Sequence, residues 1–426
     1  MKRVLLLMTT TSYRAQAFLH AAESLELEVV VGSDREQALA FANPSAHLTL
    51  DFASPEISAL RAAEFAYQHP LDAVVAADDD GVLVAAQVAR VLGLRHASVE
   101  AVAAARSKRL FRDRLATAGV AGPRYFELGI DAYPVEAARQ ATYPCVLKPL
   151  SLSASRGVIR VDDEASFLEA FRRIASLLSR AEAPGASERR GILVEEYLPG
   201  SEVALEGILT DGQLRTLALF DKPDPLEGPY FEETIYVTPS RFPLPVREAI
   251  VDQTAAAARA LGLSHGPIHA EMRINELGVW MLEIAPRSIG GLCSRALRFT
   301  DGATLESLVL RHALGEDITV FEREPKASGV MMIPIPQPGV LRAVGGVERA
   351  GRVPGVDDLV IAVPTGQRLV PLPEGARYLG FIFARGERPS DVEESLRQAH
   401  ALLSFVIEND DAPQPDPGLP CGRQGA

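Results

Sequence analysis

The sequence is poor in the features that mark secreted, membrane-spanning and nucleic-acid-binding proteins. Its 426 residues contain only three cysteines, at positions 145, 293 and 421, whose unrelated spacings exclude a disulfide framework or a cysteine metal cluster and fit a reducing cytosol. No apolar run approaches membrane-spanning length, and residues 4–8 are too short for the core of a signal peptide. A net charge of −13 argues against general nucleic-acid binding. We therefore expect a cytoplasmic protein without a membrane or nucleic acid as partner.

The first hundred residues alternate between apolar runs and amphipathic segments. The runs predict strands and the amphipathic segments predict helices, which together indicate an open parallel sheet. The expected strands are residues 4–8, 28–32 and 73–77, and the expected helices are residues 14–27 and 82–92. The loop after the first strand lacks G-x-G-x-x-G, so it predicts no dinucleotide site. We interpret the aspartate run 78–80 as a solvated loop and helix start, although ligands gather at the carboxyl ends of such strands.

Composition and turn signals divide the chain into three folded parts and a tail. We expect an N-terminal open-sheet domain over 1–100, a two-part central domain over 101–318 with a lid at about 123–200, and a small α+β domain over 319–408. The fold class is therefore α/β and α+β multidomain. Residues 378–384 predict a strand and 391–405 a closing helix. Residues 409–426, rich in Pro, Gly and Asp, predict a disordered tail.

A hairpin with two acids at its open end is the most informative feature of the sequence. Residues 269–274 and 279–284 predict strands on either side of a turn. This places Glu271 and Glu283 together, where two carboxylates repel each other unless a cation lies between them. Arg287 and the pair of glycines at 290 and 291 follow at once, on a loop able to approach a phosphate or carboxylate. This layout is typical of a Mg²⁺–nucleotide site.

Two motifs upstream of the hairpin strengthen that interpretation. Lys148 ends an apolar strand, lies before a proline, and precedes a loop of small residues at 151–157 whose backbone N–H groups can close over phosphates. Residues 195–202 read E-E-Y-L-P-G-S-E, which places a strand, a Pro-Gly turn and spaced acids in sequence. Backbone groups of such a segment can bind an adenine edge, and a carboxylate can accept hydrogen bonds from a ribose diol.

Taken in order, these motifs resemble those of the ATP-grasp ligases. The resemblance covers about residues 1–315, and the last domain is similar to that of bacterial L-amino-acid ligases and their carboxylate–amine relatives. It implies ATP and Mg²⁺ (or Mn²⁺) as cofactors, small-molecule carboxylate and amine substrates, and an acyl-phosphate intermediate. The expected product is a dipeptide or amide, and a homodimer remains open.

The resemblance also implies a role for each matching residue. Lys108 and Lys148 contact phosphates, and Arg287 holds the transferred phosphoryl group. The remaining ATP-binding positions are Ser153, Ser155 and Gly157 of the small-residue loop, Glu195 and the backbone of Glu196, Tyr197 and Leu198 at the adenine, and Glu202 at the ribose. Glu271 and Glu283 bind Mg²⁺. Gly290 and Gly291 approach the acyl substrate, and Glu233, in the long loop 221–234, holds a substrate ammonium.

One position departs from the family pattern, and three alternatives stay open. The family often has asparagine as a further metal ligand where this chain has Ala285. A catalytically degenerate ATP-binding module is therefore one alternative. A purine-pathway ligase and a biotin-carboxylase-like enzyme are the others, and the acid-rich loop 222–234 disfavours an acceptor that carries a phosphate. We interpret His269 as a core histidine rather than a catalyst.

Overall fold

The computed structural model describes residues 1–10, 12–35, 44–180 and 190–409. The expected tail over 409–426 lies outside the described residues except for its first position. No described helix is long and apolar enough to cross a membrane. The architecture confirms the expected fold class, with a parallel sheet at the N-terminus and three antiparallel sheets among the described residues after it.

The N-terminal part is a four-stranded parallel sheet in the order β3-β2-β1-β4. Its strands are β1 (Arg3–Leu7), β2 (Glu28–Ser33), β3 (His47–Thr49) and β4 (Ala73–Ala76), and its helices are α1 (Ala15–Ser24), α2 (Pro55–Gln68) and α3 (Val82–Leu92). Four of the five residues of β1 are buried, because helices cover both faces of the sheet. The three strands and two helices predicted for this part are confirmed.

Two short helices lead from this sheet into the central part of the chain. They are α4 (Val99–Arg106) and α5 (Lys108–Thr117). The hydroxyl of Ser107 accepts a hydrogen bond from the backbone N–H of Leu110, which satisfies one free donor at the start of α5. This cap starts α5 at Lys108 and carries that lysine into the interior of the molecule.

The lid is an antiparallel sheet in the order β5-β8-β6-β7, packed against one long helix. Its elements are β5 (Tyr125–Gly129), α6 (Pro134–Gln140), β6 (Cys145–Pro149), β7 (Ile159–Val161), α7 (Glu164–Arg180) and β8 (Gly191–Glu196). The apolar stripe of α7 buries Phe167, Phe171 and Ile174 against this sheet.

An eight-stranded sheet runs through the centre of the molecule, in the order β13-β12-β9-β10-β11-β14-β18-β16. Its strands are β9 (Ser201–Thr210), β10 (Gln213–Lys222), β11 (Ile235–Thr238), β12 (Gly266–Asn275), β13 (Gly278–Ala285), β14 (Ala327–Ile333), β16 (Val356–Ile361) and β18 (Gly380–Gly386), with helix α8 (Leu244–Leu261). The β12–β13 hairpin confirms the predicted hairpin. The sheet continues across the expected boundary at 318, so the C-terminal strands extend the central sheet.

The C-terminal part adds a three-stranded sheet and corrects one predicted element. Its remaining elements are α9 (Leu305–Ala313), β15 (Gly339–Gly345), α10 (Val347–Gly351), β17 (Arg368–Leu369), α11 (Pro389–Ala401) and β19 (Ser404–Glu408). The predicted closing helix over 391–405 is wrong at its end, because α11 stops at Ala401 and a strand follows. That strand pairs with β15, so tertiary hydrogen bonding overrides the helical pattern there.

Buried Arg14 fastens the N-terminal sheet to the central part of the chain. Its guanidinium donates to the carbonyl of Ala77 at 3.0 Å and to the hydroxyl of Ser288 at 2.7 Å, and it forms an ion pair with Glu306 at 3.4 Å. One apolar cluster also joins β1 and α1 to α9. The N-terminal sheet therefore packs rigidly beside the hairpin acids.

A turn of the C-terminal part is hydrogen-bonded to the lid. The backbone N–H of Gly157 donates to the carbonyl of Pro373 at 2.8 Å, and Arg156 donates to the carbonyl of Glu374 at 3.0 Å. The carboxylate of Glu374 accepts from Arg173 of α7 at 2.6 and 2.9 Å. The small-residue loop is thus held in place by residues more than two hundred positions away in the sequence.

Candidate active site

A cavity of about 800 Å³ lies where the N-terminal sheet, the lid and the central sheet meet. It is lined by three groups of residues from these parts. They are Thr9, Asp34, Asp79 and Asp80 of the N-terminal part, Lys108, Lys148 and residues 151–155 with Glu195–Leu198, and Glu202, Glu233, Glu271, Glu283 and Ala285. The fold therefore brings most of the predicted site residues to one cavity.

Lys148 and Glu195 form an ion pair at the lid end of the cavity. Their atoms Nζ and Oε2 are 2.5 Å apart, and Arg112 donates to the other oxygen of Glu195 at 2.6 Å. Burial alone would raise the pKa of Glu195, but the two cations and their hydrogen bonds outweigh it and lower this pKa to about 2. Both oxygens of the Glu195 carboxylate therefore contact cations of the protein itself. The structure gives no support for the predicted contact of this carboxylate with adenine, and neighbouring groups are better placed to make it.

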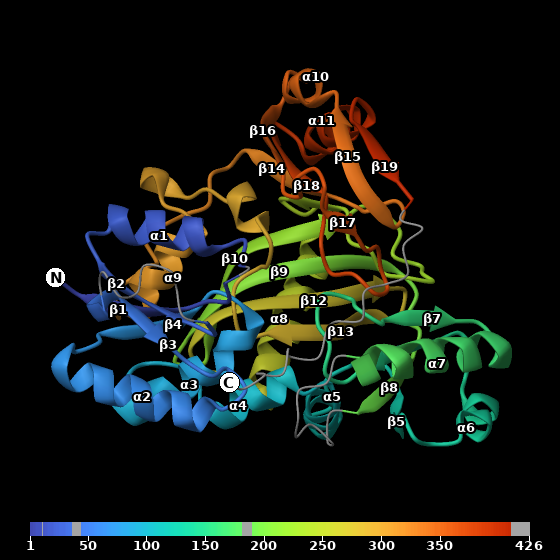
Figure 1. Ribbon diagram of the computed structural model, residues 1–426, viewed down its shortest axis with the longest axis horizontal. Helices are drawn as coiled ribbons and strands as arrows, with labels where there is room; N and C mark the ends of the chain where they lie inside the picture. Colours follow the sequence, from blue (N-terminus) through green and yellow to red (C-terminus); the bar gives the residue numbers. More distant parts are fainter. Residues whose placement is uncertain (11, 36–43, 181–189, 410–426) are drawn as a thin grey trace, which may run out of the picture.

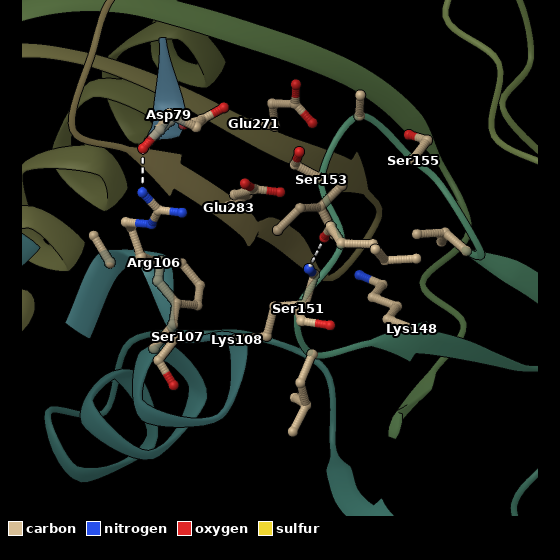
Figure 2. A pocket seen from close by; sticks show the side chains of 18 of the residues that line it. Asp79, Arg106, Ser107, Lys108, Lys148, Ser151, Ser153, Ser155, Glu271 and Glu283 are labelled. Atoms are coloured by element: carbon tan, nitrogen blue, oxygen red, sulfur yellow. Dashed lines mark hydrogen bonds between the residues drawn. The ribbon is translucent and has the colours of Figure 1, made fainter. Parts of the chain in front are cut away.

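Lys108 closes the small-residue loop from the opposite side. Its ammonium donates to the carbonyl of Leu152 at 2.6 Å, as Figure 2 shows. Burial lowers the pKa of Lys108, and the nearby Glu283 carboxylate partly offsets this effect. Lys108 and Lys148 therefore bring two positive charges to the same end of the cavity.

The small-residue loop lines the cavity along part of its length. Ser153 and Ser155 lie in the wall, and Ala154 and Ser155 have φ angles of 54° and 56°, which turn successive backbone groups the same way. Gly157 departs from its expected role, because its N–H donates to Pro373 and it is not among the lining residues. Glycine suits this position because its φ is 68° and because a Cβ atom added here would lie 3.0 Å from Pro149.

The segment predicted to bind adenine also lines the cavity, but two of its three N–H groups are already used. The N–H of Glu196 donates to the carbonyl of Arg124, and that of Tyr197 donates to the carbonyl of Pro144. Of these three described residues, Leu198 is the one whose N–H stays available to a ligand. Val146 and Leu282 line the same cavity and supply apolar surface.

The two hairpin acids lie directly opposite each other, as the sequence predicts. Glu271 of β12 pairs in register with Glu283 of β13, and a bulge follows Glu271. Both residues line the same cavity as the two lysines (Figure 2), and Glu283 is close enough to Lys108 to influence its pKa. Glu283 is exposed to the cavity and forms no ion pair within the described part of the chain.

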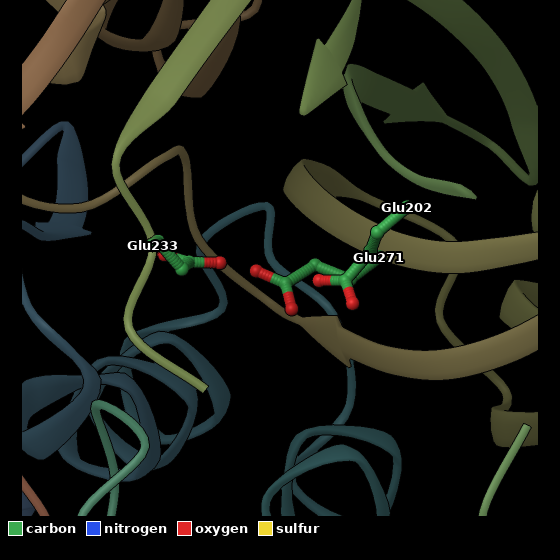
Figure 3. A group of neighbouring side chains, drawn as sticks. All are labelled: Glu202, Glu233 and Glu271. Carbon is green, nitrogen blue, oxygen red and sulfur yellow. The ribbon is translucent and has the colours of Figure 1, made fainter. Parts of the chain in front are cut away.

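Three acids form a second cluster, which sequence reasoning divided among three roles. Glu202, Glu233 and Glu271 each offer an oxygen within 4.8 Å of the others (Figure 3). Glu202 was expected at the ribose, but its carboxylate accepts from Lys222 at 2.7 Å and from Arg273 at 3.1 Å. Glu202 is 8% exposed and lines the cavity, so its contact with a ribose stays a prediction.

His269 is buried, as predicted, but it contacts the site directly. Its Nδ1 lies 3.1 Å from Glu206 and its Nε2 lies 3.3 Å from Glu271. Burial would lower the pKa of His269, but hydrogen bonds and charge from the two carboxylates raise it to about 9. Glu206 is itself held by the backbone N–H of Ile289. His269 therefore orients Glu271 as a positively charged neighbour.

Arg287 forms an ion pair that the sequence did not suggest. Its guanidinium lies 2.7 Å from the carboxylate of Asp79, which belongs to the aspartate run after β4. The interpretation of this run as a solvated loop is wrong. Asp78 accepts from Thr9 and Ser12, and Asp79 lines the cavity. The position of the run at the carboxyl end of a parallel strand was the available signal.

The predicted contact of Gly290 and Gly291 with substrate finds no support in the geometry. Neither glycine is among the residues that line the cavity. Gly291 has a φ of 60°, and the ring of Phe381 would lie 3.3 Å from an added Cβ. A tight turn against an aromatic ring therefore accounts for a glycine at this position.

Three protein families match successive parts of the chain. They are described as an ATP-grasp N-terminal domain (residues 19–96), an ATP-grasp domain (residues 141–296) and an L-amino acid ligase C-terminal domain 2 (residues 331–408). The chain belongs to the ATP-grasp superfamily. The matched ATP-grasp domain holds Lys148, Glu195, Glu271 and Glu283, which line the cavity together with residues of the N-terminal part.

Individual relatives agree with this assignment. The chain is 28% identical over 216 residues to the alanine–anticapsin ligase of Bacillus subtilis (strain 168), covering 48% of this ATP-grasp chain and 45% of that protein. Overall, the chain spans about half the length of the curated relatives it matches.

Two solved structures share the fold. The crystal structure of an L-amino acid ligase from Bacillus licheniformis superposes with a TM-score of 0.82 at 23% identity, covering 96% of this chain and 99% of that one. A carboxyaminoimidazole ribonucleotide synthase from Aspergillus clavatus, complexed with ATP, superposes with a TM-score of 0.71 at 17% identity, covering 94% and 98%.

Proposed function

We propose that this chain is an ATP-dependent carboxylate–amine ligase. It joins an amino acid to another amino acid or amine and releases ADP and phosphate. One observation carries the proposal: a single cavity places Lys108 and Lys148 near the hairpin acids Glu271 and Glu283. The similarity of the last domain to those of L-amino acid ligases, and of about half of the chain to an alanine–anticapsin ligase, supports an amino acid as substrate.

The lid end of the cavity suits a nucleoside triphosphate. Lys108 and Lys148 supply positive charge for the phosphates, and the N–H of Leu198 and the apolar Val146 and Leu282 supply an adenine pocket. The chain shares its fold with the synthase that was crystallised with ATP, which supports the same nucleotide here.

The opposed carboxylates of Glu271 and Glu283 fit a hard divalent cation. Mg²⁺, or Mn²⁺, prefers oxygen ligands and takes few from the protein when phosphates supply the rest. Ala285 lines the cavity without offering an oxygen, so the protein contributes two carboxylates here. The bound ion would neutralise phosphate charge during transfer.

The reaction needs positioning rather than an enzyme nucleophile. A substrate carboxylate oxygen attacks the γ-phosphorus of ATP, the bond to the bridging oxygen breaks, and ADP leaves with the electron pair. The amine nitrogen then attacks the acyl carbon, phosphate leaves, and the nitrogen loses its proton to solvent. Arg287, aimed by Asp79, stabilises the negative charge of the phosphoryl group and of the acyl-phosphate.

The acids at the end of the cavity away from Lys148 favour an amine substrate that carries no phosphate. Glu233 lines the cavity and uses Oε1 to accept from both Lys222 and Tyr236, which leaves Oε2 to accept from a substrate ammonium. A ribotide acceptor would instead require cations facing the cavity at this end. A purine-pathway ligase, whose acceptor is a ribotide, is therefore disfavoured.

The decisive experiment traps the acyl-phosphate. Purified protein is incubated with ATP, Mg²⁺ and single amino acids, with hydroxylamine replacing the amine. We expect ADP release only with an accepted carboxylate, together with one hydroxamate per ADP. Release of AMP and pyrophosphate would overturn the mechanism, because adenylation breaks a different bond.

A matched pair of lysine variants controls for the site. Lys148→Ala removes a cation from the cavity and should lower ADP release at least about 100-fold. Lys326→Ala removes an exposed lysine from the C-terminal part and should leave ADP release unchanged. Equal activity of the two variants would show that the phosphates bind elsewhere.

A further inference from the structure

A single buried lysine occupies the centre of the three-carboxylate cluster. The Nζ atom of Lys222 lies 2.7 Å from Glu202 and 3.4 Å from Glu271, and it also forms an ion pair with Glu233. Its side chain is 2% exposed, and the ring of Tyr236 lies 4.9 Å from the ammonium. The carboxylates that converge in Figure 3 therefore already share a cation.

Two further basic side chains contact the cluster. Arg273 donates to Glu202 at 3.1 Å, and His269 lies 3.3 Å from Glu271. His269 is shared with Glu206, which lies 3.1 Å from its Nδ1 atom. Among the described residues, Lys222 is therefore the cation that contacts all three carboxylates of the cluster.

Glu283 differs from these acids in both exposure and pairing. It lies across the hairpin from Glu271, faces the cavity, and forms no ion pair within the described residues. A carboxylate of this kind attracts a divalent ion, whereas a carboxylate bonded to an ammonium must first lose that partner. The side of Glu271 that faces Glu283 is thus electrostatically distinct from the side that faces Lys222.

We propose that Lys222 is a resident cation that keeps divalent ions out of the Glu202–Glu233–Glu271 cluster. Lys222 acts as a positioning residue that holds the carboxylates of Glu233 and Glu271. A divalent ion then binds only together with the nucleotide, on the side of Glu271 that faces Glu283. An ion inside the cluster would lie beside the ammonium with few water molecules between them, where repulsion is strong. The role of the nucleotide rests on the proposed function, but the exclusion of the ion does not.

Manganese binding without nucleotide tests this inference directly. Free Mn²⁺ is titrated by electron paramagnetic resonance against the native protein, Lys222→Met and Lys222→Arg. The native protein and the arginine variant should bind Mn²⁺ only in the millimolar range. Lys222→Met should gain one site with about 100-fold higher affinity, because one buried positive charge is gone. A merely structural lysine would not produce a new ion site when replaced.

Two further proteins show where the new ion binds. Lys222→Met combined with Glu233→Gln should lose the gained site, and Lys326→Met, at an exposed position, should bind like the native protein. Tight nucleotide-free binding of Mn²⁺ by the native protein would overturn the inference even if no Lys222 variant folds. The hydroxamate assay reads the proposed function separately, because the titration uses neither ATP nor substrate.

Discussion

The two ends of the cavity contain the same kinds of side chain in different proportions. At the Lys148 end, three cations surround one buried acid: Lys108, Lys148 and Arg112 lie near Glu195. At the Lys222 end, the three acids of the cluster and Glu206 meet three basic side chains. Both ends are buried, so the difference lies in the balance of charge.

This difference explains how one cavity can accept chemically unlike ligands. Surplus positive charge at the Lys148 end attracts a polyanion such as a triphosphate. The Lys222 end has no surplus of cations, so it can bind an ammonium through a free carboxylate oxygen without attracting phosphates. If the two ends differ in this way, substitutions at each end and between them should have different effects.

The largest effect should come from removing Arg112. It is 3% exposed and pairs with Glu195 at 2.6 Å, so Arg112→Leu leaves a buried carboxylate with one cation fewer. We expect a loss of about 3–5 kcal/mol in the free energy of unfolding, measured in urea. The matched control is Arg109→Leu on the same helix, whose pairs with Asp113 and Glu127 are half exposed. A loss equal to that of the control would show that the Lys148 end is solvated.

The two ends should lose stability on opposite sides of neutral pH. The pKa of Glu195 is lowered from 4.5 to about 2, so its contribution is present above pH 4.5 and lost as pH falls towards 2. The pKa of His269 is raised from 6.5 to about 9, so its contribution is complete below pH 6.5 and lost as pH rises towards 9. Each amounts to on the order of 3 kcal/mol.

Urea unfolding across pH in metal-free buffer measures both contributions. Glu195→Gln should flatten the acid side of the native profile, and His269→Gln should flatten the alkaline side. If either variant changes both sides equally, the two networks are coupled and the comparison between the ends fails.

The third prediction locates the divalent ion between the two ends. Glu283→Gln removes the charge of the acid opposite Glu271, which forms no ion pair within the described residues, so ADP release should fall about 100-fold and require more Mg²⁺. Ala285→Asn adds a neutral oxygen, so it should lower the Mg²⁺ requirement and change turnover little. A native protein that is inactive with every acid–amine pair, but gains turnover on Ala285→Asn, would favour a degenerate module.

The sequence was sufficient for those parts of the site that depend on neighbours in the chain. The hairpin turn fixes the register of its own strands, so the opposition of Glu271 and Glu283 was predictable. Lys148 and the residues from 195 to 202 were recognisable for the same reason, because each belongs to a short motif. The parallel N-terminal sheet followed from apolar runs that alternate with helices.

Partners far apart in sequence account for what could not be predicted. Arg112 and Glu195 are 83 positions apart, and Arg287 and Asp79 are 208 apart, so no local pattern links them. Lys222 is the last residue of β10, but the acid-rich segment around it in the sequence predicts a loop with a solvated charge rather than the centre of a cluster. The end of the predicted closing helix was wrong for the same reason, because β19 pairs with the distant strand β15 and the helix stops before it.

The contacts of Arg14 determine when the N-terminal sheet can complete its core during protein synthesis. Its acceptors at Ser288 and Glu306 lie 274 and 292 positions later in the chain, and the apolar cluster of β1 and α1 includes Leu305 and Leu308 of α9. The ribosome therefore makes this sheet first but supplies its covering residues only after most of the chain. Until then the apolar surface that β1 and α1 share with α9 stays exposed, so we expect the nascent N-terminal part to bind chaperones.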